Sequence, residues 1–137
     1  MNKLAKVLIF KIVGTIALWC VPMILFPIYI LNLIGFPEQD SYMFIRLLGW
    51  AYLALCVGYY HAFKAALNGK RLMAPIWVGI ISNGGGFMYL LLFGLSGVWS
   101  SWGVWIQVVA WGSVVATALI TLGLYHYGVN GDEPKIE

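Results

Sequence analysis

The chain has 137 residues, of which 62% are hydrophobic and only 9% are charged. Soluble domains carry about 25% charged residues, so this composition excludes an ordinary water-soluble domain. The net charge of +3 is small and its lysines and arginines are spread along the chain, which argues against a nucleic-acid-binding protein.

Four apolar stretches are long enough to cross a bilayer, which takes about 18 residues or more. They lie at about residues 12–33, 43–63, 75–95 and 104–126. They predict an all-α integral membrane protein of one domain, residues 1–137. We expect a four-transmembrane-helix, up-down-up-down bundle with short loops. The polar residues 128–137 are expected to form a short mobile tail.

Basic residues give the expected orientation. Seven of the eight fall on one side of the predicted spans: Lys3, Lys6, Lys11, Lys64, Lys70, Arg71 and Lys135. By the positive-inside rule, both termini are then cytoplasmic, and the first span is an uncleaved anchor. The five asparagines include no glycosylation sequon, which fits a bacterial inner membrane.

Two prolines interrupt the first span. Pro22 and Pro27 lack the N–H groups that would bond the carbonyls of Leu18 and Met23, so a kink is expected in the outer half.

Arg46 is the one basic residue on the other side. It could pair with Glu38 or Asp40, reach lipid phosphate, or form an anion or headgroup site at the outer mouth. Gln107 is expected at a similar depth.

Small residues recur at helical spacing in three spans and predict close helix packing. They are Ala51, Ala54, Gly58 and Ala62 in span two, Gly79, Gly84, Gly85 and Gly86 in span three, and Gly112 and Ala116 in span four.

Asn83 is the one amide expected at the middle of a span, and Thr117 is expected at the same depth. With Ser113 and Thr121 these residues could form a polar layer that binds a ligand or lines a pathway. Alternatively, Asn83 holds helices together and the hydroxyls bond the carbonyls of their own helix.

The two histidines end similar segments, Gly58-Tyr59-Tyr60-His61 and Gly123-Leu124-Tyr125-His126, which could mark an internal duplication. His61 and His126 are expected to be interfacial residues. Alternatively, they ligate a haem, form a quinone site or act as a proton-linked switch. No metal-ligand cluster is present in the sequence, and Cys20 and Cys56 are expected as packing residues.

No catalytic motif is found, and all five acidic residues lie in a loop or the tail. We therefore expect a protein that is not an enzyme. The leading hypothesis is a small membrane protein that acts through helix packing, as a homo-oligomer or as an accessory subunit of a larger membrane complex. The alternatives are a transporter or channel for a small solute or lipophile, with its polar layer at Asn83 and Thr117, and a redox subunit using the histidines.

Overall fold

The computed structural model describes residues 1–38, 41–131 and 134–136. Within this part, four helices are long and apolar enough to cross a membrane, in agreement with the predicted all-α architecture. The first is built from three consecutive pieces: α1 (Lys3–Thr15), a π-helical turn η1 (Ile16–Cys20) and α2 (Val21–Leu25). The others are α4 (Met43–Leu67), α5 (Met73–Leu95), and α6 (Val104–Gly123) continued by the π-helical η2 (Leu124–Val129).

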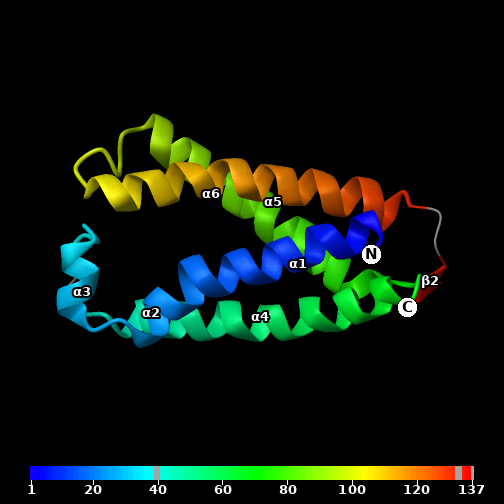
Figure 1. Ribbon diagram of the computed structural model, residues 1–137. Helices are drawn as coiled ribbons and strands as arrows, with labels where there is room; N and C mark the ends of the chain where they lie inside the picture. Colours follow the sequence, from blue (N-terminus) through cyan, green and yellow to red (C-terminus); the bar gives the residue numbers. More distant parts are fainter. Residues whose placement is uncertain (39–40, 132–133, 137) are drawn as a thin grey trace.

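The helices lie side by side with both termini at one end of the molecule (Figure 1). We call this the termini end. There the short strand β1 (Arg71–Leu72) pairs in parallel with β2 (Lys135–Ile136). At the other end, which we call the loop end, the backbone N–H of Gly103 donates to the carbonyl of Gly35 over 3.0 Å. The short helix α3 (Ile28–Leu33) also lies there.

The first helix begins at Lys3, and the prediction that it begins near residue 12 is wrong. Asn2 is its N-cap, because the Asn2 side-chain oxygen accepts the N–H of Ala5 at 2.8 Å. The side-chain nitrogen of Asn2 donates to the carbonyl of Ala66 at 2.7 Å, and this bond connects the start of α1 to the end of α4. A polar cap thus extends the helix into a segment that contains three lysines.

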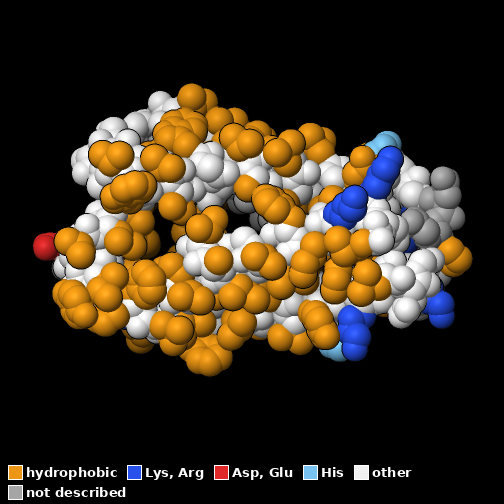
Figure 2. Space-filling view, viewed as in Figure 1, with side chains coloured by type: hydrophobic (Ala, Val, Ile, Leu, Met, Phe, Trp, Pro, Cys, Tyr) orange, Lys and Arg blue, Asp and Glu red, His pale blue; other side chains and the backbone are white. Residues whose placement is uncertain are grey.

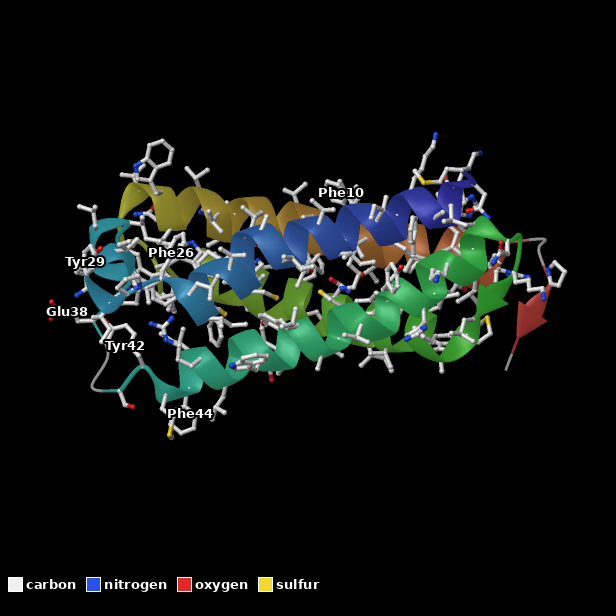
Figure 3. The ribbon with its side chains drawn as sticks, turned by 60° about the horizontal axis from the view of Figure 1, so that its bottom comes forward. Phe10, Phe26, Tyr29, Glu38, Tyr42 and Phe44 are labelled. Atoms are coloured by element: carbon white, nitrogen blue, oxygen red, sulfur yellow. The ribbon has the colours of Figure 1, made fainter. Side chains whose placement is uncertain are left out.

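Pro27 ends the helix, as its missing N–H predicts, although the result is a break and not a kink. The helix stops at Leu25, and Phe26 is extended with ψ 129°. The predicted single span over 12–33 is therefore wrong, because residues 28–33 form the separate helix α3. Figure 3 shows Phe26 pointing between the helices, whereas the exposed Phe10 and Phe44 project away from them.

The predicted free tail is wrong for the residues that the structure describes. The helix continues to Val129, and buried Arg71 donates to the carbonyls of Gly128 and Val129 at 2.9 and 3.1 Å. Residues 135–136 then pair with β1. An arginine thus satisfies acceptors that the helix end leaves without partners.

Two apolar clusters hold the bundle. The larger one packs all four helices at the termini end around fully buried Leu8, Tyr59, Ile76 and Leu124. The smaller one joins Trp99, near the loop end, to Ala110 and Val114 of α6. The functional site lies between them.

Candidate functional site

A cavity of about 320 Å³ lies among the four long helices. Its apolar wall includes Trp19, Leu55 and Leu90. Its polar lining comes from all four helices: Lys11, Thr15, Tyr52, Tyr59, Ser82, Asn83, Ser113 and Thr117. We call these eight side chains the polar cavity lining.

Lys11 belongs to this interior, and the prediction that it forms part of the basic flank is wrong. Because α1 begins at Lys3, Lys11 lies eight residues in, about 12 Å along the axis. Its side chain is only 5% exposed. The ammonium lies 4.2 Å from the centroid of the Tyr59 ring. Among the described residues it has no hydrogen-bond acceptor and no carboxylate partner, so most of its hydrogen-bonding capacity faces the cavity.

Asn83 is 7% exposed and projects into the same cavity. Its amide nitrogen donates to the carbonyl of Gly79 at 2.5 Å and contacts the Ser82 hydroxyl at 3.4 Å. Ser82 also bonds the hydroxyl of Tyr59 at 3.0 Å. No described residue donates to the amide oxygen of Asn83. Asn83 is therefore held by its own helix and does not bond across helices.

The hydroxyls of α6 divide between two roles. Thr117 donates to the carbonyl of Ser113 at 2.7 Å, and Thr121 donates to that of Thr117 at 2.8 Å, as the back-bonding alternative predicts. Ser113 and Thr117 line the cavity with Asn83, so the structure brings together these three residues of the predicted polar layer. Thr121 does not line it and instead faces Gly84.

A second cavity, of about 480 Å³, continues toward the loop end and is almost wholly apolar. It shares Trp19, Tyr52, Leu90 and Phe93 with the first cavity, so the two adjoin. Trp99 forms part of its wall, and the buried indole N–H of this residue has no acceptor among the described residues. Figure 2 shows the hollow between the helix layers, which is bordered by hydrophobic side chains.

Arg46 and Gln107 do not line either cavity. The guanidinium of Arg46 donates to the carbonyls of Met23 and Phe26, each at 2.6 Å. Met23 carries the carbonyl that Pro27 was predicted to leave without an N–H partner. Arg46 donates to this carbonyl instead. Glu38 is exposed at the loop end (Figure 3), and the alternative pairing with Asp40 lies outside the described residues.

Gln107 has a similar role at the loop end. Its side-chain nitrogen donates to the carbonyls of Ser100 and Trp102 at 3.2 and 2.8 Å. Both residues predicted at the outer mouth therefore bind backbone carbonyls.

The small residues predicted to pack helices fall into two groups. Ala62 and Gly79 are buried, and a β-carbon added at Gly79 would come 2.6 Å from the Leu124 side chain. Gly84 contacts Thr121, and Ala116 is partly buried. The remaining small residues make no close helix contact within the described part of the chain. Ala51, Ala54, Gly85 and Gly112 are exposed, and an added β-carbon would meet no atom within 4 Å at Gly58, Gly85, Gly86 or Gly112.

The two histidines are both exposed, and they contact the neighbouring rings of Tyr60 and Tyr127. Histidine side chains appear at opposite edges of the molecule (Figure 2). The described contacts do not join His61 to His126, and the haem or quinone hypothesis stays a prediction.

Sequence reasoning missed Lys11, Thr15, Tyr52 and Tyr59 as members of the polar cavity lining. One signal was available. Lys11, Thr15 and Trp19 are spaced four apart, which places them on one face of a helix that starts at an asparagine cap. Known proteins add nothing to this assignment, since no protein-family model, curated protein or solved structure matches the chain.

Proposed function

We propose that this chain is an integral membrane protein whose four long helices span the bilayer in alternating directions, with both termini cytoplasmic. Hydrophobic side chains cover most of the face in Figure 2, and lysine and arginine gather at the termini end. That distribution supports the positive-inside orientation. A bacterial inner membrane fits the sequence best.

Orientation can be tested by labelling with a membrane-impermeant maleimide in spheroplasts. Both native cysteines are buried, so a cysteine introduced at Ser100 should react and one introduced at Lys70 should react only after lysis. The reverse pattern would contradict the orientation.

Within the bundle, the function that the geometry supports best is binding of a small lipophile, for storage or for transfer across or along the bilayer. The observation that carries this proposal is the polar cavity lining. Buried polar groups in a packed core are normally paired, yet within the described ranges the Lys11 ammonium and the Asn83 oxygen have no hydrogen-bond partner, and both line one cavity beside an apolar one.

Two neighbouring glycines provide a matched test. Gly86 lines the cavity and an added β-carbon there meets no atom within 4 Å, so Gly86→Leu should fill the space without a backbone clash. Gly85 has equally open surroundings but is exposed, so Gly85→Leu serves as the control. In native mass spectrometry from a non-ionic detergent, 1-dodecanol should bind the wild type and Gly85→Leu but not Gly86→Leu. Equal binding to all three would refute a lipophile site in this cavity.

A second candidate function, self-association or docking onto a partner subunit, is favoured by one face of α4. Ala51 and Ala54 are exposed and Gly58 has no neighbour within 4 Å of an added β-carbon, so this small-residue face is uncovered in the single chain. Gly58→Leu should abolish the oligomer seen by crosslinking in membranes, whereas Val115→Leu, exposed on α6, should not. A wild type that crosslinks to nothing would remove this candidate.

A further inference from the structure

The interior holds the Lys11 side chain, and the described part of the chain places no carboxylate beside it. The acidic residues are Glu38, Asp40, Asp132, Glu133 and Glu137, and none falls within a described helix. Glu38 is exposed at the loop end, away from Lys11. Buried charges in proteins are normally paired, because an isolated one is costly to desolvate. The Tyr59 ring offsets only part of that cost.

Several hydrogen-bonding groups around Lys11 are free to bind a ligand. The ammonium carries three donors. The hydroxyls of Thr15, Tyr52 and Ser113 line the same cavity and make no side-chain hydrogen bond within the described part of the chain. The one side-chain oxygen of an amide there is that of Asn83. The hydroxyls can donate or accept, whereas the ammonium of Lys11, the one charged residue of this lining, only donates and is cationic, so the cavity favours an anionic head group that accepts hydrogen bonds.

We propose that the two adjoining cavities bind a single-chain carboxylic acid, with its carboxylate on Lys11 and its apolar chain in the cavity toward Trp99. This inference rests on the proposed lipophile-binding function and names the ligand class. The size of the cavities, about 320 and 480 Å³, is within the range of small-molecule sites. The two cavities share part of their wall, including Trp19 and Tyr52. One ligand can therefore place its carboxylate in the first cavity and its apolar chain in the second.

The test compares dodecanoate with 1-dodecanol, which has the same chain without the charge. Titrations followed by native mass spectrometry in a non-ionic detergent give both affinities. The wild type should bind dodecanoate at least about tenfold more tightly, because hydrogen bonds to charged groups contribute that much. Lys11→Met should bind dodecanoate about 10- to 100-fold more weakly and should lose the preference for dodecanoate over 1-dodecanol that the wild type shows. Lys6→Met, exposed on the same helix, should behave as the wild type.

Lys11→Arg keeps the charge and should keep the preference for the acid, which separates charge recognition from a general loss of folding. Equal affinities of the wild type for dodecanoate and 1-dodecanol would overturn the carboxylic-acid inference and leave the lipophile site intact. Displacement of dodecanoate by an equimolar diacyl phosphatidylglycerol would overturn the single-chain assignment. Loss of 1-dodecanol binding in Gly86→Leu remains the separate test of the proposed function.

Discussion

Lys11 should make the ligand-free protein less stable than it could be. Replacing Lys11, a residue that is 5% exposed, with methionine keeps about the length of the side chain and removes its ammonium. A lysine near the centre of a membrane helix costs about 2.5–3.5 kcal/mol. The contact with the Tyr59 ring at 4.2 Å returns roughly 0.5–2 kcal/mol. The difference predicts that Lys11→Met raises the free energy of unfolding by about 0.5–3 kcal/mol.

Reversible unfolding in mixed micelles provides the assay. Delipidated protein in a non-ionic detergent is titrated with dodecyl sulfate, and loss of structure is followed by circular dichroism. Lys6→Met is the matched control, because Lys6 is exposed on the same helix, and it should change the stability by less than about 0.5 kcal/mol.

Unfolding of Lys11→Met at a lower dodecyl sulfate fraction than the wild type would refute the predicted gain in stability. That result would mean that the ammonium is well solvated or paired in the folded bundle. The same unfolding assay can be repeated with dodecanoate added. Dodecanoate should stabilise the wild type more than Lys11→Met, since a ligand stabilises the state that binds it.

The same unfolding assay tests three further residues or pairs. Arg46→Leu removes two hydrogen bonds from a charged group to carbonyls at the helix break and should cost about 2–3 kcal/mol; an unchanged midpoint would mean that water replaces the guanidinium. Gly79→Ala should cost about 1–3 kcal/mol, because the new methyl group would lie 2.6 Å from a Leu124 methyl group. Gly112→Ala has open surroundings and should stabilise by about 0.5–1 kcal/mol, so equal effects at the two glycines would contradict the packing described. Asn2→Ala should cost about 1–2 kcal/mol through loss of the helix cap, and no loss would show that the first turn is held in another way.

The sequence predicts the parts of this fold that depend on backbone chemistry and length. Four apolar stretches give four long helices, and the missing N–H of Pro27 correctly marks an interruption and the Met23 carbonyl as an acceptor for another group, although the interruption is a break and not the predicted kink. Asn83 and Thr117, which counting along the helices puts at one depth, line a common cavity. Each of these follows from counting residues along a helix, which requires no knowledge of which face turns inward.

What the sequence could not give is the rotation of each helix about its axis. In a chain this apolar, the outward face resembles the inward one. Phe10 is 60% exposed and lies next to the buried Lys11, which is the reverse of the order expected in a water-soluble domain. The flanking position of Lys11 among other lysines suggested an orientation signal. Lys11 lies inside the helix because the helix, capped by Asn2, starts at Lys3 and not near residue 12.

Contacts between helices at both ends of the bundle limit the routes by which a ligand enters the cavities. At the termini end, the Asn2 amide joins the first helix to α4, and Arg71 joins β1 to the end of η2. At the loop end, Gly35 and Gly103 touch so closely that a side chain on Gly35 would overlap the opposite backbone. These contacts at both ends oppose the rocking of one half of the bundle against the other by which alternating-access carriers work. We expect a ligand to enter sideways between helices, beside the two adjoining cavities and the π-helical turn at residues 16–20.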